Sequence, residues 1–483
     1  MTDNNAFERF VADHLADDGS GSAQAERLAA LIDDRTSERR QRPTWLASIT
    51  QPPMRTSNQL AVGSPTVRVA AIAVATMMLA VALAAVGAGA QRLMAANAQI
   101  IVAEDGNGDF RTISEAVAKA SDGDRILVRS GTYRESVTID KAVTLQGEGG
   151  RDAVILAFPS DSPGMEFTDG REGDPENPLV TFSVPTGIRL AADDIVLSDM
   201  TITGAYPGVA IAVDAGTADL SDLTVALEAA DADEDWDPAS HTRIALIVAE
   251  GADADLRRST LDADVTALEG GSLTVEQSVL TGGDVSGDPE SRLAVHDNVL
   301  TDAGIGSDGA RAEIDGNQIV RGFIAVGGNG TYAVTDNHID DLRYDVGPGI
   351  AISAWESGEV EITGNTVTNS DTGIKLIFFG GSAFIDGNTV ESTRTGISVG
   401  GDKATVSNNT IEGSDIIGLE VYNTGPMLTG NSITGGGTGL HLATTDAATA
   451  SDNTICDNRT NVRVVSGELP DLSGNDICED GTD

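Results

Sequence analysis

The chain has 483 residues, of which 75 are acidic and 30 are basic, so its formal net charge is −45 at pH 7. Such a surface repels the phosphates of nucleic acids, which excludes DNA and RNA as partners. Aromatic residues make up only 4% of the chain while glycine occurs 55 times. This composition favours a repetitive fold with a narrow aliphatic core over a conventional globular domain.

The first 66 residues predict two short segments. Residues 1–40 carry apolar side chains at near-helical spacing on both sides of a Gly-Ser break, which indicates short amphipathic helices. That segment is too short to bury a substantial core of its own. Residues 41–66 contain four prolines and predict a juxtamembrane linker.

Residues 67–90 predict a transmembrane helix. The run from Val69 to Ala90 is 22 residues without a charge, and a helix of that length spans about 33 Å, enough for the hydrocarbon core of a bilayer. Five arginines lie between residues 39 and 68, before the run. The positive-inside rule therefore places residues 1–66 in the cytoplasm and the rest of the chain outside the membrane. The alternative is a secreted protein, cleaved near Ala90 after an A-x-A pattern.

Residues 98–147 predict the beginning of a β-domain. Ile113, Ala116, Val117 and Ala120 fall on one face of a short helix, with Ser114 as a candidate N-cap. Short strands are predicted over residues 125–128, 136–139 and 143–147. A helix at this place would cap one end of a solenoid, where strand edges and core would otherwise face water.

From residue 298 onward the chain repeats. An Asn recurs at intervals of 19–28 residues, and a branched aliphatic residue follows it two positions later. Each repeat also contains two segments of alternating apolar residues, such as Gly396-Ile397-Ser398-Val399. Three short strands per repeat, with no room for a helix, predict an all-β parallel β-helix of about 13–15 coils over residues 98–480. The repeated residues are Asn298, Asn317, Asn337, Asn365, Asn388, Asn409, Asn431, Asn453 and Asn475.

The repeat predicts two structural features of the coils. We expect each Asn to occupy a corner, where Asn tolerates a left-handed backbone and its amide can bond to the amide of the next coil. Cys456 and Cys478 are 22 residues apart, which is one coil. Equivalent Cα atoms on adjacent parallel strands lie about 4.8 Å apart, within the range of a disulfide. The sequence therefore predicts a Cys456–Cys478 bond in the last coil; the alternative is two buried thiols.

These repeats, and the opening helix and strands, resemble the right-handed parallel β-helix proteins of the pectin-lyase-like superfamily. The opening is similar to that of pectin methylesterases. The resemblance implies a right-handed solenoid and a carbohydrate ligand, but no catalytic residue carries over. Those esterases have a catalytic Asp-Phe-Ile-Phe-Gly segment, and the segment of this chain that is superficially similar, Phe378-Phe379-Gly380-Gly381, lacks the Asp. The sequence leaves catalysis open; an enzyme would be a polysaccharide lyase, hydrolase or esterase.

One column of outward-facing residues is a candidate ligand site. Stacked coils would align the variable positions of the Gly-aliphatic-x-aliphatic strands about 4.8 Å apart. The mixed acidic, basic and imidazole column, flanked by Tyr422, could bind a glycan or could be a solvated face stabilised by neighbour pairs. Trp355 and Trp236 are candidate platforms for a sugar. The column consists of Ala351, Lys375, Ser398, Glu420, His441 and Arg463.

A longer gap between coils, from residue 223 to 259, contains a cluster of carboxylates. The cluster is either a solvated acidic loop or a weak calcium site, and no other cofactor is predicted. Its members include Asp231, Asp233, Asp235 and Asp237.

These features predict a membrane-anchored extracytoplasmic β-helix protein that binds, and as an enzyme would process, cell-surface or environmental polysaccharide. The alternative is a non-catalytic structural or adhesive rod of the cell envelope. The regular repeats and the missing catalytic sets favour a protein that is not an enzyme, whereas the resemblance favours a carbohydrate ligand.

Overall fold

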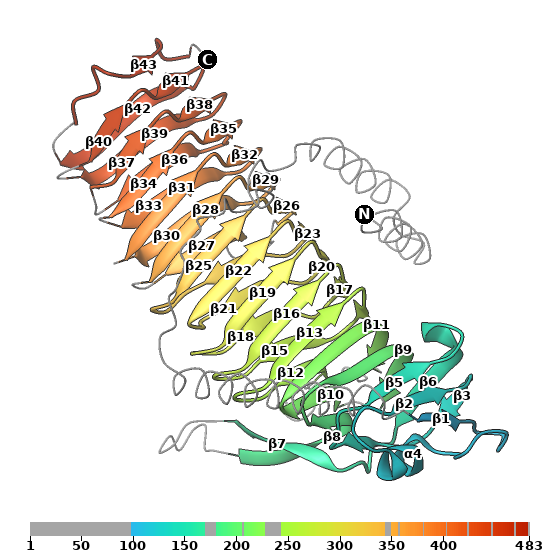
Figure 1. The fold of residues 1–483 in the computed structure, drawn as a ribbon. Helices are drawn as coiled ribbons and strands as arrows, with labels where there is room; N and C mark the ends of the chain where they lie inside the picture. Colours follow the sequence, from blue (N-terminus) through green and yellow to red (C-terminus); the bar gives the residue numbers. More distant parts are fainter. Residues whose placement is uncertain are drawn as a thin grey trace, which may run out of the picture. The chain divides into compact units, whose positions relative to one another are not determined.

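The computed structural model describes residues 98–169, 180–204, 207–227, 243–342, 349–355, 358–379, 381–401, 403–422, 425–445, 448–467 and 470–481. Residues 99–483 form one compact unit. It is an all-β parallel solenoid of right-handed type with about 15 turns, which confirms the predicted fold (Figure 1).

The predicted segments 1–40 and 41–66 and the predicted transmembrane helix 67–90 lie outside the described residues. Within the described residues, no helix is long and apolar enough to cross a membrane.

Two sheets wind along the described part of the solenoid. Sheet A has 28 strands in two rows, and sheet B has 15 strands. The first row of sheet A consists of β1 (Gln99–Val102), β2 (Arg125–Val128), β5 (Thr144–Gly147), β9 (Ile195–Gly204), β11 (Thr217–Leu227), β13 (Asp253–Arg257), β16 (Ser272–Glu276), β19 (Arg292–His296), β22 (Arg311–Asp315), β25 (Thr331–Thr335), β28 (Glu359–Thr363), β31 (Ser382–Asp386), β34 (Ala404–Ser407), β37 (Met427–Thr429) and β40 (Thr449–Ser451).

The second row follows the first after one sharp corner, and the long strands β9 and β11 pass through both rows. The other strands of this row are β3 (Gly131–Tyr133), β6 (Val154–Phe158), β14 (Thr260–Leu261), β17 (Val279–Thr281), β20 (Val299–Thr301), β23 (Gln318–Val320), β26 (His338–Asp340), β29 (Thr366–Thr368), β32 (Thr389–Glu391), β35 (Thr410–Glu412), β38 (Ser432–Thr434), β41 (Thr454–Cys456) and β43 (Asp476–Ile477).

Sheet B closes each coil and is parallel throughout, apart from the antiparallel strand β7 (Gly164–Asp169) at its edge. Its parallel strands are β4 (Val137–Ile139), β8 (Val180–Ala191), β10 (Gly208–Ala215), β12 (Arg243–Val248), β15 (Asp264–Ala267), β18 (Val285–Gly287), β21 (Ile305–Ser307), β24 (Ile324–Val326), β27 (Ile350–Trp355), β30 (Thr372–Phe379), β33 (Thr395–Gly401), β36 (Ile417–Tyr422), β39 (Thr438–Thr445) and β42 (Thr460–Gly467).

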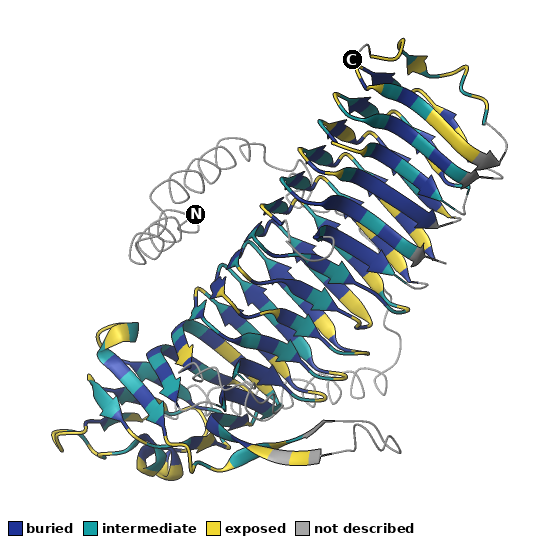
Figure 2. Cartoon of the chain, turned by 180° about the vertical axis from the view of Figure 1, so that it is seen from behind, coloured by how far each residue is buried: buried dark blue, intermediate teal, exposed yellow. Residues whose placement is uncertain are grey.

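The core is a stack of aliphatic side chains inside the coils, as the alternation predicts. The aliphatic residue two positions after each ladder Asn is at most 1% exposed from Leu300 to Ile455. Figure 2 shows the same pattern, with buried positions alternating along the strands from coil to coil. Each coil thus buries its apolar face only against its neighbours, which is the physics of a solenoid.

The repeated Asn residues form a continuous ladder between the two rows of sheet A. Each Asn side chain donates through Nδ2 to Oδ1 of the Asn in the next coil, from Asn298 to Asn475, at 2.7–3.0 Å. The backbone N–H of each Asn donates to the same oxygen. Ser259 and Ser278 extend the hydrogen bonding into the earlier coils.

The left-handed residue of this corner is the one before the Asn, not the Asn itself. Asp297, Gly316, Asp336 and Gly364 have positive φ, whereas no ladder Asn does. The prediction that the ladder Asn has a left-handed backbone is therefore wrong, because the left-handed residue lies one position earlier. The preceding residue turns the chain, and the Asn then points inward to satisfy buried backbone groups.

The short helix α4 (Ile113–Lys119) caps the N-terminal end, and the 3-10 turn η2 (Arg151–Ala153) follows β5. Ile113, Ala116 and Val117 are buried as predicted. The N-cap is Thr112, whose hydroxyl accepts from the Glu115 N–H at 3.2 Å. Ser114, the predicted cap, instead donates its backbone N–H to Glu135, because that carboxylate reaches the helix from a neighbouring coil.

Candidate functional site

Sheet B aligns a row of polar side chains on the outer face of its last coils. The register pairs Ser353 with Lys375, Lys375 with Ser398, Ser398 with Glu420, Glu420 with His441, and His441 with Arg463. We call Lys375, Ser398, Glu420, His441 and Arg463 the polar stripe. Ala351 was expected in this column, but the register places Ser353 there.

A hydrogen-bonded chain lies in the middle of the polar stripe. The Ser398 hydroxyl donates to Glu420 Oε2 at 2.8 Å. Glu420 Oε1 lies 3.5 Å from His441 Nδ1. Both imidazole nitrogens are buried and neither makes a hydrogen bond. This contact is an ion pair only when the imidazole is protonated, and it has no hydrogen bond.

Two cations lie on either side of this series of hydrogen-bonded and contacting side chains. Lys375 lies on the coil before Ser398, and Arg463 lies on the coil after His441. Neither side chain forms an ion pair with a described residue. Arg463 is exposed and Lys375 is partly exposed. Acids outnumber bases by 45 in the chain, so two cations without an acidic partner among the described residues form a locally positive part of this face.

Tyr422 forms one wall of the polar stripe. Its ring lies over Gly400, where any Cβ would collide with it, and its hydroxyl donates to the Leu376 carbonyl at 2.8 Å. Burial, with the nearby Glu420 carboxylate, raises the pKa of the Tyr422 phenol above its ordinary value. The phenol therefore stays neutral and remains a hydrogen-bond donor.

Trp355 lies two residues past Ser353, so strand alternation puts it on the same outer face as the polar stripe, at one end. It pairs with Ile377, two residues past Lys375, while its indole packs over Gly327 in the preceding coil. Trp355 is partly buried there. The structure thus brings Lys375, Glu420, Tyr422, His441 and Arg463 together, and places Trp355 at the margin. Trp236 and the calcium candidates Asp231, Asp233, Asp235 and Asp237 lie outside the described residues.

An apolar cluster covers the other end of sheet B. The hairpin of β7 and β8 packs Met165 and Phe167 against the outer side chains of β10 and β12, including Ala212 and Ile247. Figure 1 shows this hairpin beside the first coils. The outer face of these first coils is therefore occupied by the hairpin of the chain itself.

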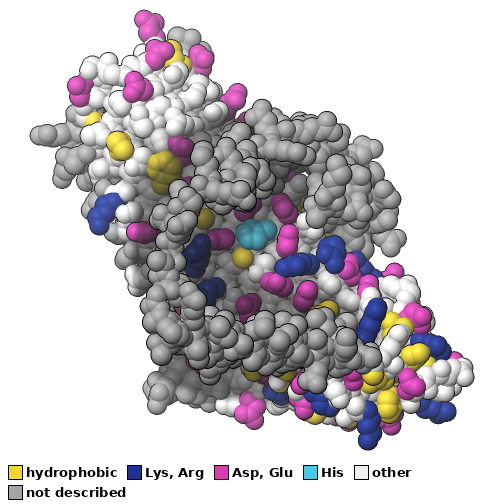
Figure 3. All heavy atoms as spheres, viewed as in Figure 1, with side chains coloured by type: hydrophobic (Ala, Val, Ile, Leu, Met, Phe, Trp, Pro, Cys, Tyr) yellow, Lys and Arg dark blue, Asp and Glu magenta, His cyan; other side chains and the backbone are white. Residues whose placement is uncertain are grey.

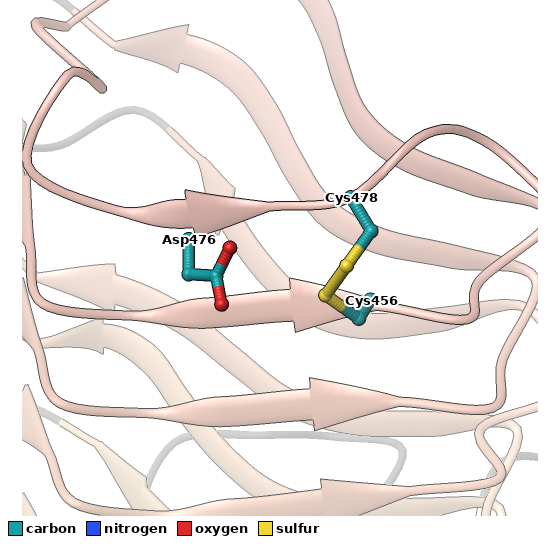
Figure 4. A group of neighbouring side chains, drawn as sticks. All are labelled: Cys456, Asp476 and Cys478. Carbon is teal, nitrogen blue, oxygen red and sulfur yellow. A yellow bond between two sulfur atoms is a disulfide. The ribbon is translucent and has the colours of Figure 1, made fainter.

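The last coil contains the two cysteines of the chain. Cys456 and Cys478 are joined by a disulfide, with Cα atoms 4.9 Å apart (Figure 4). Together with Asp476 they are the group of metal-ligand type that the described residues bring within 4.8 Å of one another. The sulfur atoms are bonded to each other, so they are not available as thiolates.

Two family models match successive parts of the solenoid. A model described as pectinesterase matches residues 99–224, and a model described as periplasmic copper-binding protein (NosD) matches residues 290–478. The polar stripe lies wholly within the second match.

Similar proteins cover only pieces of this arrangement. A pectinesterase/pectinesterase inhibitor U1 of Solanum lycopersicum is 30% identical over 140 residues, 26% of this chain and 22% of that protein. A pectinesterase of Daucus carota is 37% identical over 65 residues, 12% of this chain and 20% of that protein. The chain therefore spans about a fifth of the length of these relatives.

A solved structure of a mannuronic-acid-specific polysaccharide lyase of family 6, from human gut microbiota, aligns with a TM-score of 0.46 at 11% identity. The alignment covers 71% of this chain and 86% of that one. The two family matches and the stacked three-strand coils support a pectin-lyase-like parallel β-helix.

Proposed function

We propose that the chain binds an acidic, uronate-containing polysaccharide along the polar stripe. The observation that carries this proposal is the pair of cations, Lys375 and Arg463, that have no acidic partner among the described residues. A carboxylate ligand would supply the missing partner, and charge-assisted hydrogen bonds of this kind, which are about twice as strong as neutral ones, would have to offset the repulsion between a polyanion and the net charge of −45.

The spacing of the polar stripe supports an extended ligand. Adjacent coils are about 4.8 Å apart, which is close to the length of one sugar unit in an extended chain. Lys375 and Arg463 are four coils apart, so a chain lying along the solenoid would place a carboxylate at each end of a short oligosaccharide. Between them the partly exposed Glu420 carboxylate offers acceptor oxygens to hydroxyl groups, while Ser398 is buried behind it.

The family matches support a carbohydrate ligand in general terms, since the model over residues 99–224 is described as pectinesterase. That match ends before the polar stripe begins, so it assigns no role to the stripe residues. Processing of the polysaccharide would be a second step, and the partly exposed Glu420 carboxylate is the stripe group that could act in it as a base, since both His441 nitrogens are buried and the Tyr422 hydroxyl donates to the Leu376 carbonyl.

Binding assays with the full chain test the proposal. Polygalacturonate and alginate oligomers should bind, and the double variant Lys375→Ala/Arg463→Ala should weaken binding about tenfold or more, because hydrogen bonds to charged groups contribute about 1.5–3 kcal/mol each. Arg292→Ala is the matched control, since Arg292 is an exposed cation on sheet A. Uronates that bind the double variant and the parent equally would overturn the proposal.

A reducing-end assay and an assay for methanol release separate a binding protein from an enzyme. Release of new ends indicates a lyase or hydrolase, and release of methanol indicates an esterase. Absence of both, with binding intact, leaves a binding protein; absence of binding favours the structural rod, whose stiffness would come from the Asn ladder.

We also propose an extracytoplasmic location with a membrane anchor over residues 67–90. The uncharged run Val69–Ala90 and the preceding arginines support the anchor, and the matched NosD model is described as periplasmic. Fractionation of cells that express the full chain tests this: the protein should stay with the membrane after washing with high salt. Protein released into the soluble extracytoplasmic fraction, with a new N-terminus near Ala90, would favour the cleaved alternative.

Copper, which the NosD description names, does not fit the donors that the described residues bring together. Cys456 and Cys478 are bonded to each other, and a disulfide sulfur is a poor ligand compared with a thiolate. Asp476 alone does not make a copper site.

A further inference from the structure

An exposed aromatic side chain stands on the outer face of sheet A, away from the polar stripe. Phe384 belongs to β31 and is 41% exposed. Its register neighbours are Glu361 on the coil before and Thr405 on the coil after. Figure 3 shows isolated hydrophobic side chains standing on the C-terminal coils of a face that is otherwise dotted with acidic groups.

Phe384 lines an open groove of about 480 Å³. Glu359 and Glu361 of β28 form one side, and Lys403 and Thr405 form the other. Ala333 is small, and it extends the floor by one coil beyond Glu361. We call Glu359, Glu361, Phe384 and Lys403, with the residues between them, the Phe384 groove.

The charged side chains of the Phe384 groove have no partners among the described residues. Neither Glu359 nor Glu361 nor Lys403 makes a side-chain hydrogen bond or ion pair with any described residue. Other charged side chains of sheet A are paired, as in Arg311–Glu313 and Arg257–Asp255. A shallow site with an exposed ring and unpaired polar groups is suited to a ligand that offers both an apolar face and hydroxyl groups.

We infer that the Phe384 groove is a second carbohydrate subsite, and that it binds neutral polysaccharide rather than uronate. The C–H face of a pyranose can lie on the phenyl ring, while carboxylates accept hydrogen bonds from ring hydroxyls and the ammonium donates to them. Two carboxylates against one ammonium repel a polyanion. The two faces of the solenoid would therefore select different sugars, and this inference does not depend on the polar stripe.

A second copy of the chain is a poorer occupant. A stable protein interface buries about 800 Å² on each partner, whereas the exposed large apolar side chains in this row of β31–β37 are Phe384 and Met427 alone among the described residues. Two copies with a net charge of −45 each would also repel each other.

Binding of neutral hexasaccharides to the full chain tests the inference. Cellohexaose, mannohexaose and maltohexaose are titrated into the parent, Phe384→Ala and Glu361→Gln by calorimetry. We expect at least one of the three to bind, with affinity reduced about tenfold by Phe384→Ala and less by Glu361→Gln, because the amide keeps an acceptor oxygen. Met427→Ala is the matched control: it removes an exposed apolar side chain from the same row, two coils away, and should leave the affinity unchanged.

The outcomes separate the two faces and the two occupants. Lys375→Ala/Arg463→Ala should not change binding of the neutral sugar, and Phe384→Ala should not change binding of a uronate. The inference fails if none of the neutral hexasaccharides binds, or if Phe384→Ala and Met427→Ala behave alike. It also fails if light scattering shows that the parent is a dimer and that Phe384→Ala is a monomer.

Discussion

At the scale of single residues, two residues adjacent in sequence form each corner of sheet A. The residue before the ladder Asn adopts positive φ and changes the direction of the chain. The Asn itself points inward and satisfies the buried groups that the turn leaves open, because its amide can donate and accept at once. Asn365, for example, accepts from Asn337 and donates to Asn388 and to the Val334 carbonyl.

Replacing one rung of the ladder should destabilise the solenoid. Asn365→Ala removes the acceptor of the buried Asn337 N–H and one of the three acceptors of Asn337 Nδ2, at a cost of about 1–3 kcal/mol for the unpaired N–H. Thermal unfolding followed by circular dichroism should show a melting temperature several degrees lower. Asn107→Ala, at an exposed loop position, is the control. Equal melting of the two variants would mean that the ladder contributes no stability.

A second residue-scale prediction concerns Asp264, whose pKa is raised above 3.8, mainly by burial. Because the folded pKa exceeds the unfolded one, the stability contributed by proton binding is fully present below pH 3.8 and is lost as the pH rises through the folded pKa. Asp264→Asn removes that loss and keeps an oxygen for the Asp284 N–H.

The melting temperature of Asp264→Asn should therefore exceed that of the parent by roughly 1–2 °C at pH 7, and the two should converge below pH 3.8. Asp253→Asn, at an exposed position, should show no such difference. A variant less stable than the parent at pH 7 would contradict the assigned cause.

At the scale of elements, the Asn period predicted most strands because each coil repeats the same apolar pattern at a fixed distance from the corner. The Asn period placed Ala351, instead of Ser353, in register with Lys375. The preceding coil is longer, and Ile350 and Ile352 alternate in a way that two registers, two residues apart, satisfy equally. Only the pairing of Ile352 with Ile374 decides between them.

Features that depend on side-chain direction or on distant partners could not be read from the sequence. The hairpin of β7 and β8 carries no repeat, and its apolar side chains find partners in β10 and β12. The aromatic rings of Trp355 and Tyr422 lie over Gly327 and Gly400, which is a matter of rotamer choice. The outward direction of Phe384 could have been predicted, because strand alternation places its side chain outside the coil. An aromatic residue at an outward position indicates an exposed platform for a ligand.

The last element predicts a local role for the disulfide. Only two residue pairs join β43 to β41, so the bond between Cys456 and Cys478 has few contacts to assist it. The loop it closes spans 22 residues, for which the chain-entropy model gives about 3 kcal/mol. Cys456→Ser/Cys478→Ser should therefore fray the last coil while the earlier coils stay intact.

Hydrogen exchange measures this effect residue by residue. The Cys478 N–H, which donates to the Ile455 carbonyl at 3.1 Å in the parent, should lose protection in the double variant, while the amides of β16 and β19 keep theirs. Uniform loss of protection along the solenoid would show that the bond supports global rather than local stability.

At the scale of the whole molecule, charge is the dominant feature. Acidic residues number 75 and basic ones 30, so one-to-one pairing would still leave 45 acids without a basic partner. The ion pairs that exist, such as Arg258–Asp222 and Arg321–Asp302, are at least partly exposed, and pairs of this kind contribute about 0–1 kcal/mol each. Repulsion among the excess carboxylates therefore outweighs attraction within the pairs.

Salt should consequently stabilise the full chain. The screening length falls from about 30 Å at 0.01 M ionic strength to about 10 Å at 0.1 M, so repulsion between carboxylates on different coils weakens while close pairs lose less. We expect the melting temperature to rise with sodium chloride over this range and to rise equally with tetramethylammonium chloride, because screening does not depend on the identity of the cation. A fall in melting temperature would show that the ion pairs dominate after all. A rise produced by calcium at concentrations too low to change the ionic strength would instead reveal a specific cation site, and would make the carboxylates between residues 223 and 259 the first to replace with amides.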